Sequence, residues 1–255
     1  MSEYLDVCMV LYRSDSMALQ ALTHLIAYTP VPLRFILVDN GGGSGRHLLR
    51  WLPEVQCVYI ANPENVGYYA AMNQCLGLAE SEHVIIAAPD HFVLPRWFEP
   101  LGVALEHFGL RWASPDWRTG PYDRAVAWEA LAADSVEIEL GRASTSCALI
   151  DWAKLKEEIG YFDERFFLTH GDTDYLERMR DKELRCGIVR GIMTHHDEHG
   201  ARKWNTAEDD TAMEIADGVA FAAKWADRPD VTARHPPLDP DALRQIKRTL
   251  WDEQQ

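Results

Sequence analysis

Two neighbouring stretches decide how this chain folds: Gly160-Tyr161-Phe162-Asp163-Glu164-Arg165-Phe166-Phe167, and then Gly171-Asp172-Thr173-Asp174-Tyr175. The first supplies aromatic residues for a core, and the second places two carboxylates at 172 and 174, where a helix-like pattern begins. One of these acids could cap the helix, because a side-chain oxygen at a helix start accepts a hydrogen bond from an unpaired backbone N–H. The other acid would then be available for chemistry.

Short apolar runs alternate with helix-like segments upstream of these stretches. We expect buried strands over 7–12, 34–38, 55–60 and 83–88, helices over 15–28 and 68–79, and a helical turn at 47–51. This order predicts an α/β fold with a mostly parallel sheet and helices on both faces. Ligands bind beyond the carboxyl ends of the strands in such sheets. Polar residues follow all four strands: Arg13-Ser14-Asp15, Asp39-Asn40, Asn62 with Asn65, and Asp90-His91.

The rest of the chain is less regular. Residues 111–140 place Trp112, Trp117, Tyr122 and Trp128 among Pro, Gly and Asp, and we expect irregular structure or a small β insertion that covers the site. A strand over 145–150, a short helix over 152–159 and a helix over 209–226 are predicted next. The helix over 209–226 carries apolar residues at 213, 215, 216, 219, 220 and 223. A Pro- and Asp-rich linker over 227–240 and an amphipathic helix over 240–251, which could support self-association, complete the chain.

Composition narrows the class of protein. The 255 residues carry a formal net charge of −15, which argues against a long nucleic acid as partner but not against a single nucleotide. No basic leader and no apolar run of the roughly 20 residues that a membrane helix needs are present. Five scattered cysteines without a C-x-x-C pair are expected to be reduced packing thiols. We therefore expect a cytoplasmic protein without a transmembrane segment.

Two features that follow the predicted strands can be interpreted from the residues alone. Asp39 ends a predicted buried strand, where its carboxylate could accept a hydrogen bond from a nucleobase or could initiate the turn into Gly41-Gly42-Gly43-Ser44-Gly45. This Gly-rich tract matches neither G-x-G-x-x-G nor a phosphate-binding P-loop, which disfavours a dinucleotide-binding reading. Gly67 would allow the backbone to approach a ligand closely.

The stretch Asn62-Pro63-Glu64-Asn65-Val66-Gly67-Tyr68-Tyr69-Ala70-Ala71-Met72-Asn73 resembles the N-x-x-N-x-G-x-x-x-A-x-N pattern of family 2 glycosyltransferases. Asp39, Asp90, the 160–167 stretch, the 172–174 acids and a later His follow the order of that family, over about residues 5–200. The resemblance implies a GT-A fold, with a Rossmann-like, mostly parallel sheet and a smaller acceptor-side subdomain. It also implies a GT-A domain over 1–204, with a nucleotide-sugar half (1–100) and an acceptor and catalytic-base half (101–204). Residues 205–255 would form a C-terminal helical extension.

The resemblance implies roles for particular residues. The donor would contact Tyr12, Arg13, Asp39, Asn65, Gly67, Asn73 and Arg202. A divalent metal, Mn²⁺ or Mg²⁺, would bind Asp90 and one of the adjacent His195 and His196, of which we assign His195, and His91 could supplement this site. Ala88 stands where the family carries the first acid of a D-x-D motif.

On the acceptor side, Asp172 matches the catalytic base of the family by position, and Gly171 replaces the Glu that usually precedes it. Asp174 is either a helix cap or an acceptor contact. Trp117 and Trp128 are assigned to the acceptor, because aromatic faces pack on sugar rings and other flat apolar surfaces.

These matches predict a metal-assisted, inverting transfer of a sugar from a nucleotide-diphosphate sugar to an acceptor hydroxyl. A saccharide, a lipid-linked carrier or a small molecule would supply that hydroxyl. The alternative is a non-catalytic domain of the same fold that binds a sugar nucleotide or glycan, which the changes at Ala88 and Gly171 motivate. A nucleotidyltransferase is disfavoured because no Gly-rich, Lys-containing phosphate loop is found near the N-terminus.

Overall fold

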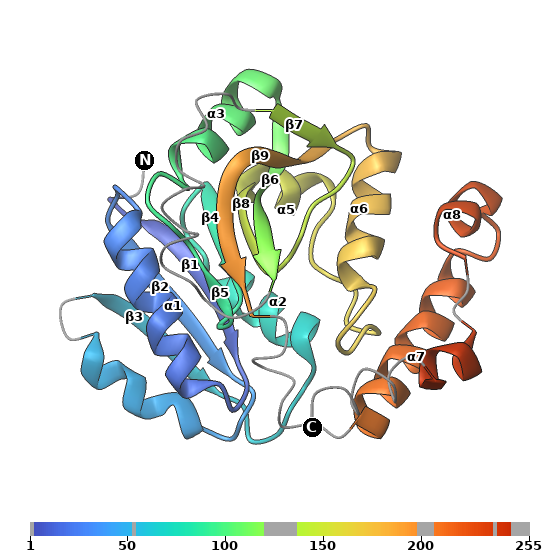
Figure 1. Ribbon diagram of the computed structural model, residues 1–255, viewed down its shortest axis with the longest axis horizontal. Helices are drawn as coiled ribbons and strands as arrows, with labels where there is room; N and C mark the ends of the chain where they lie inside the picture. The colour runs from blue at the N-terminus through green and yellow to red at the C-terminus, as the bar shows by residue number, and fades with distance from the viewer. Residues whose placement is uncertain (1–2, 53–54, 120–136, 198–206, 237–238, 246–255) are drawn as a thin grey trace.

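The computed structural model describes residues 3–52, 55–119, 137–197, 207–236 and 239–245. Within these residues, nine strands form one sheet with helices on both faces (Figure 1). The strands are β1 (Leu5–Leu11), β2 (Leu33–Asp39), β3 (Gln56–Ala61), β4 (His83–Ala87), β5 (His91–Phe92), β6 (Leu110–Thr119), β7 (Glu137–Leu140), β8 (Cys147–Asp151) and β9 (Arg185–His196).

The helices follow the predicted order closely in the first hundred residues. They are α1 (Asp15–Tyr28), the 3₁₀ helix η1 (Ser44–Trp51), α2 (Tyr68–Leu78), α3 (Glu99–Phe108), α5 (Trp152–Glu158), α6 (Gly171–Asp181), α7 (Ala207–Lys224) and α8 (Pro229–Arg234). The alternation of strands and helices predicted from the sequence is therefore confirmed.

The sheet has the strand order β3-β2-β1-β4-β8-β6-β9-β5, and β7 also pairs with β9. The pairs β2/β3, β1/β2 and β1/β4 are parallel, whereas β8 runs antiparallel to both β4 and β6. β6 and β9 pair in parallel, with register shifts between Leu110 and Trp112 and between Pro115 and Asp116. Strands from both predicted halves thus belong to one sheet, joined where β4 pairs with β8.

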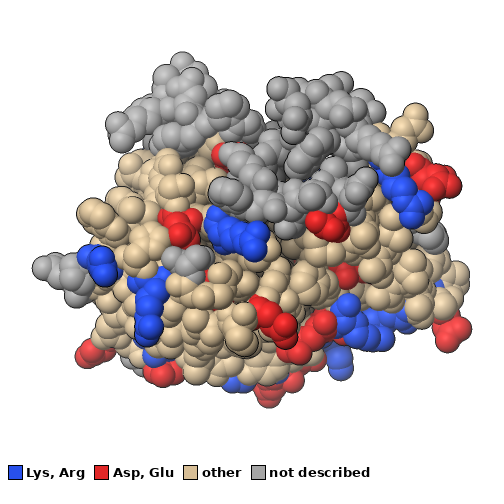
Figure 2. Space-filling view, turned by 90° about the horizontal axis from the view of Figure 1, so that it is seen from below, with Lys and Arg blue, Asp and Glu red and all other residues tan. Residues whose placement is uncertain are grey.

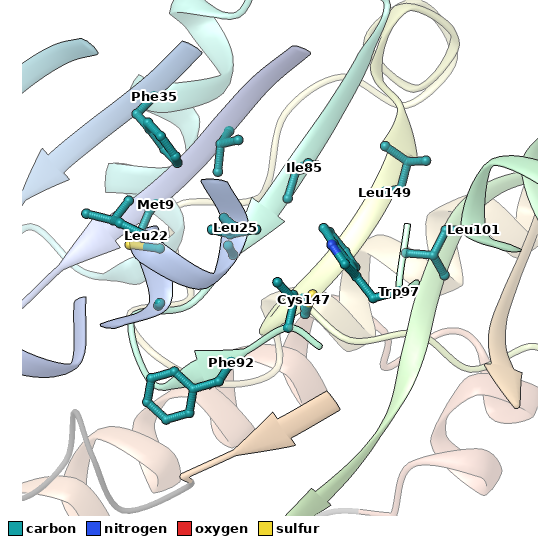
Figure 3. Close-up of a cluster of buried hydrophobic side chains, with 14 of the residues drawn as sticks. Met9, Leu22, Leu25, Phe35, Ile85, Phe92, Trp97, Leu101, Cys147 and Leu149 are labelled. Carbon is teal, nitrogen blue, oxygen red and sulfur yellow. The ribbon is translucent and has the colours of Figure 1, made fainter. Parts of the chain in front are cut away.

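Successive strand residues point to opposite faces, and both faces are buried. On one face, Met9, Phe35 and Ile85 pack against α1 and α3, together with Trp97 (Figure 3). On the other face, alternate residues of the same strands pack against α2, α5 and α6. This second cluster also includes Phe221 of α7 and Trp225, which directly follows that helix. α7 is therefore joined to the body of the protein through its core.

Three expectations are corrected. Residues 110–119 are a strand of the central sheet, because Trp112 and Ala113 pair with both β8 and β9. The predicted linker contains α8, whose Val231 is buried. The 209–226 helix exists as α7, but the buried residues of this segment are Thr211, Asp217, Phe221 and Trp225, while Val219 is 63% exposed.

The cysteines behave as predicted: none is in a disulfide, and four of the five are buried, with Cys57 half-buried. Burial raises the pKa of the Cys57 thiol to about 11. Among the helices that the structure describes, none has the length and hydropathy to cross a bilayer.

Candidate active site

The carboxyl ends of β1, β2 and β3 lie side by side at one edge of the sheet. Leu11 pairs with Asp39, and Asp39 pairs with Ala61. Just beyond these ends, the Asn40 amide donates to the Leu11 carbonyl at 2.8 Å, and the Asn62 amide donates to the Asp39 carbonyl at 2.9 Å. The polar residues that follow the strands are therefore neighbours. This edge lies at the bottom of Figure 1 and faces the viewer in Figure 2.

Asp39 is fully buried, and both of its carboxylate oxygens bind the protein. Oδ1 accepts from the Gly41 amide at 2.6 Å, and Oδ2 accepts from the Gly45 amide at 2.7 Å and the Tyr59 hydroxyl at 2.5 Å. Burial raises the pKa of Tyr59, and the hydrogen bond to Asp39 raises it further. Of the two roles open from the sequence, the geometry favours the turn-forming one: Asp39 holds the Gly-rich turn in shape rather than facing a nucleobase.

Asn65 and Gly67 form a turn at the start of α2. The Asn65 Oδ1 accepts from the Gly67 amide at 3.0 Å, and the Gly67 carbonyl accepts from Asn40 Nδ2 at 3.0 Å. Gly67 has φ of +92°, and a Cβ there would lie 2.9 Å from the backbone oxygen of Phe167. Glycine is thus required because the segment before Asp172 approaches this turn. The close approach expected of a ligand is made by the protein itself.

Asn73 joins α2 to the aromatic stretch quoted at the outset. Its Nδ2 donates to the Phe162 carbonyl at 2.9 Å, and its Oδ1 accepts from the Phe162 amide at 2.9 Å. Nδ2 also donates to Glu164 Oε1 at 2.9 Å. The amide group is therefore occupied in holding the 160–167 stretch, which replaces the donor contact predicted for it.

Tyr12 and Arg13 follow β1 at the same edge. Arg13 adopts φ of +50°, a left-handed conformation that costs a non-glycine residue energy. Its exposed guanidinium lies 5.3 Å from the centre of the Tyr12 ring, and it forms no ion pair with the residues that the structure describes. A cation beside an aromatic face at this edge suits the phosphates and base of a nucleotide.

Asp90 lies beside His196 rather than His195. β5 runs antiparallel to the end of β9, which places His91 opposite His196 and Phe92 opposite His195. The Nε2 of His196 is 3.7 Å from Oδ1 of Asp90, whereas the ring of His195 stacks on Phe92 at 5.9 Å. Adjacent strand residues face opposite sides, so the candidate metal ligand beside Asp90 is His196 and not the predicted His195.

A carboxylate and an imidazole are suitable ligands for Mn²⁺. The described residues contain no group of three or more His, Cys, Asp or Glu side chains arranged to hold an ion. Asp90 and His196 therefore fit a cation that takes its remaining ligands from substrate phosphates and water, as Mg²⁺ often does.

His91 is excluded from that site by its hydrogen bonds. The Thr194 hydroxyl donates to the Asp116 carbonyl at 3.0 Å, so it accepts from His91 Nε2 at 2.5 Å. Nδ1 of His91 then accepts from the Ser146 hydroxyl at 3.2 Å. Burial, reinforced by His196 and His195, lowers the pKa of His91 well below its ordinary value. His91 is thus a neutral residue whose two ring nitrogens both bind the protein, and it supports β5 instead of supplementing the metal site.

Asp172 lies in the first turn of α6 and is half-buried. The N-cap position is His170, which has φ of +63° and makes no capping bond, so neither acid caps the helix. Asp172 Oδ1 accepts from the Thr173 amide at 2.8 Å and from the Tyr69 hydroxyl at 3.4 Å. The Asp172 amide donates to the same hydroxyl at 3.1 Å, and Oδ2 forms no hydrogen bond with the described residues. Tyr69 therefore orients Asp172 from two sides.

Tyr69 also explains the glycine at 171. A Cβ on Gly171 would lie 2.5–2.6 Å from three atoms of the Tyr69 ring, which is 2% exposed. The ring thus occupies the space that a side chain at 171 would need.

Asp174 belongs to a buried ion-pair network. It is fully buried, with Oδ2 3.0 Å from Arg178 Nε, and Oδ1 2.6 Å from Lys224 Nζ and 3.1 Å from Trp225 Nε1. These contacts join α6 to α7 and leave no accessible atom for an acceptor. Both roles weighed for Asp174, a helix cap and an acceptor contact, are therefore wrong.

The tryptophans assigned to the acceptor differ in position. Trp117 is half-buried on β6, opposite Thr194 of β9. Trp112 is a core residue that packs on Phe162 and Tyr175. Trp128 and Arg202, the latter assigned to the donor, lie outside the described residues.

A sequence model of the family described as "Glycosyl transferase family 2" matches residues 6–170, well over half of the chain. The chain belongs to glycosyl transferase family 2. No curated protein sequence matches it.

Solved structures of S. aureus TarS share the fold of this family 2 enzyme. A crystal structure of TarS 1–349 superposes with a TM-score of 0.59 at 13% identity, over 96% of this chain and 69% of that one. TarS 1–349 in complex with UDP-GlcNAc gives 0.61 at 12% identity, over 96% and 70%. A longer TarS structure gives 0.59 at 13% identity, over 86% of this chain and 40% of that one. The GT-A-like fold predicted from the sequence is therefore confirmed.

The family match ends at residue 170, just before Asp172 and well before His196. Sequence reasoning missed two residues next to the candidate site: Tyr69, and Asp217 of α7, whose carboxylate binds the backbone amides of residues 167–169. Tyr69 occupies an unspecified position of the N-x-x-N-x-G-x-x-x-A-x-N pattern. Asp217 precedes Phe221 and Trp225 at intervals of four, and an acid on the buried face of a helix was the available signal.

Proposed function

We propose that this family 2 glycosyltransferase moves a sugar from a nucleotide-diphosphate sugar to an acceptor hydroxyl with inversion at the anomeric carbon. The observation that supports it best is the half-buried carboxylate of Asp172, oriented by Tyr69 near the edge where the parallel strands end. A carboxylate held in this way suits a general base, provided it reaches the proton that it removes.

Tyr68 is the neighbour of Tyr69 in the first turn of α2. Its hydroxyl donates to the Thr145 carbonyl at 3.0 Å, and its ring meets that of Tyr69 edge-on at 5.1 Å. Burial raises the pKa of Tyr68, and the charges of Asp172 and Asp90 raise it further. The negative charges of both carboxylates thus act on the Tyr68 hydroxyl, which supports a single site for donor and acceptor.

In the proposed reaction, Asp172 accepts the proton of the acceptor hydroxyl as its oxygen attacks the anomeric carbon. The nucleoside diphosphate leaves from the opposite face, which inverts the configuration. Tyr69 keeps the Asp172 carboxylate oriented, and Arg13 and Tyr12 contact the donor. Asp90 and His196 would hold a divalent cation, Mn²⁺ or Mg²⁺, which would offset the charge of the departing diphosphate.

TarS 1–349 has been crystallised in complex with UDP and with UDP-GlcNAc, which makes a UDP-sugar the first donor to test for this chain. A saccharide, a lipid-linked carrier or a small hydroxyl compound remains the proposed acceptor, with Trp117 on β6 as its candidate contact. Figure 2 shows acidic and basic side chains scattered over the described part of the site face, without the broad basic surface that a long polyanion needs.

The test combines binding and turnover. Thermal shifts are measured with UDP-, GDP-, dTDP- and CDP-sugars, each with Mn²⁺, Mg²⁺ or EDTA, because a ligand that binds only the native state raises the melting temperature. We expect a rise with one nucleotide class that disappears in EDTA and in Asp90→Ala. Asp172→Asn should keep that rise but release nucleoside diphosphate about 10²- to 10⁴-fold more slowly.

Asp181→Asn is the matched control, because it removes an acid from the same helix. Among the described residues, Asp181 pairs with Arg228 alone, at the surface. A donor-dependent shift without turnover in the unmodified protein would favour the non-catalytic binding domain. An Asp172→Asn variant as active as the Asp181→Asn control would remove Asp172 from the mechanism.

A further inference from the structure

Residues 167–169, which lead from the aromatic stretch toward Asp172, are held from two sides. On one side lies α2: the Tyr68 amide donates to the Phe167 carbonyl at 2.6 Å, and Gly67 permits the close approach of Phe167. On the other side lies α7, which contributes the carboxylate of Asp217.

Asp217 binds three consecutive backbone amides of this segment. Oδ1 accepts from the Phe167 amide at 2.8 Å, and Oδ2 accepts from the amides of Leu168 at 2.8 Å and Thr169 at 2.7 Å. The Thr169 hydroxyl also donates to Oδ2 at 3.3 Å. Asp217 is 2% exposed. A buried carboxylate is costly unless its oxygens are satisfied, and hydrogen bonds to an ionised acceptor are among the strong ones.

The three amides lie directly before the residues that set the position of Asp172. His170 follows Thr169 in a left-handed conformation, Gly171 packs under the Tyr69 ring, and α6 starts there. A shift of the 167–169 backbone would therefore move the start of α6. Displacement of a reacting group by about 1 Å can lower a rate about 10²-fold.

We propose that Asp217 is a positioning residue for the reaction: by binding the 167–169 amides from α7, it fixes the start of α6 and hence the direction of the Asp172 carboxylate. This inference rests on the proposed role of Asp172. It also makes α7 part of the active-site architecture, although α7 lies in the segment predicted to be an extension.

The first experiment needs no substrate. Backbone amide hydrogen exchange is measured by NMR for the unmodified protein, Asp217→Asn and Trp225→Phe. Asn has nearly the same shape as Asp, but an NH₂ group takes the place of one carboxylate oxygen. This NH₂ is a donor and cannot accept a hydrogen bond, so contacts to the 167–169 amides are lost. We expect faster exchange in Asp217→Asn at residues 167–169 and at the Asp172 amide, which donates to Tyr69.

Trp225→Phe is the matched control. Trp225 directly follows α7, and its replacement removes the hydrogen bond from the indole to Asp174 of α6. The variant should lower stability, and Trp225 makes no hydrogen bond to the 167–169 amides. If it speeds exchange at the Asp172 amide as much as Asp217→Asn does, at equal loss of global stability, or if Asp217→Asn leaves that amide unchanged, the positioning role is overturned.

The second experiment measures release of UDP from UDP-GlcNAc with Mn²⁺. Asp217→Asn should lower kcat about 30- to 100-fold with little change in KM for the donor, and Trp225→Phe should not. In the Asp172→Asn background, Asp217→Asn should cause no further loss, because residues that act through one group are not additive.

Equal fold losses in both backgrounds, or an unchanged kcat in Asp217→Asn, would overturn the inference. A failure of the proposed function gives a different result: Asp172→Asn would then keep full activity, or no UDP would be released by the unmodified protein. The hydrogen-exchange comparison would still decide whether Asp217 fixes the start of α6.

Discussion

A methyl group added at Gly171 would overlap the ring of Tyr69. The new Cβ would lie 2.5–2.6 Å from three ring atoms, about 1 Å closer than ordinary van der Waals contact. The ring has little room to move, because Tyr69 is 2% exposed and also packs on Phe162 at 5.3 Å. Gly171→Ala must therefore displace either Tyr69 or the first turn of α6.

Overpacking of this kind costs about 1–3 kcal/mol. For a chain of this length, a loss of 2 kcal/mol lowers the melting temperature by about 4–8 °C. The assay is urea and thermal unfolding of Gly171→Ala beside Gly102→Ala, a matched control. Gly102 lies inside α3, where a Cβ would meet no atom within 4 Å, so alanine there should stabilise by about 0.5–1 kcal/mol.

A double-mutant cycle isolates the contact. Tyr69→Leu alone should cost about 2–3 kcal/mol through lost packing, but it vacates the space that the added methyl group needs. The double variant should therefore be at least about 1 kcal/mol more stable than the sum of the single losses predicts. A Gly171→Ala protein within about 0.5 kcal/mol of the unmodified one, or an additive cycle, would refute the account of why glycine stands here.

Two further predictions concern residues whose roles changed once the structure was known. Asn73→Ala should lower the free energy of unfolding by about 2–3 kcal/mol, because the Phe162 amide and carbonyl lose their partner. The nucleotide-induced thermal shift should stay intact. Loss of that shift in a folded variant would restore a donor-binding role for Asn73. Burial lowers the pKa of His91, so near neutral pH and below it the unfolded state binds a proton that the folded state does not. The stability that His91 contributes is therefore present above the unfolded pKa of about 6.5 and is lost as the pH falls below it. The loss is up to about 1.4 kcal/mol per pH unit. Urea unfolding at pH 7.5 and 5.5 should show a smaller difference for His91→Gln than for the unmodified protein, and equal differences would contradict this assignment.

β1 to β4 could be predicted because each is a short apolar run followed by polar residues, whereas the two-residue β5 has no such pattern and was not predicted. β6 could not, because Pro115 and Asp116 interrupt its pattern and a register shift absorbs the irregularity. A strand that pairs on both sides with distant partners is stabilised by tertiary contacts rather than by its own periodicity.

At the site, the order of motifs located Asp90 and Asp172, but not which polar side chains are occupied by the protein. Asp39, Asn73 and Asp174 all have the chemistry to bind a ligand. Each is instead saturated by hydrogen bonds or ion pairs to segments between 2 and 91 positions away in sequence. Such partners depend on the fold, so spacing within one motif could not reveal them. The choice of His196 over His195 likewise depends on strand register.

The contact between Asp217 and Phe167 joins residues 50 positions apart, and Asp217 lies on α7, which follows all nine strands in the sequence. A chain emerges from the ribosome with its N-terminal part first, and that part begins to fold first. During synthesis, β1 to β4 can assemble while the segment before Asp172 still lacks its α7 partner. The chain would thus acquire a donor-side scaffold earlier than a competent base, so the onset of activity would mark the arrival of α7 and not the completion of the sheet.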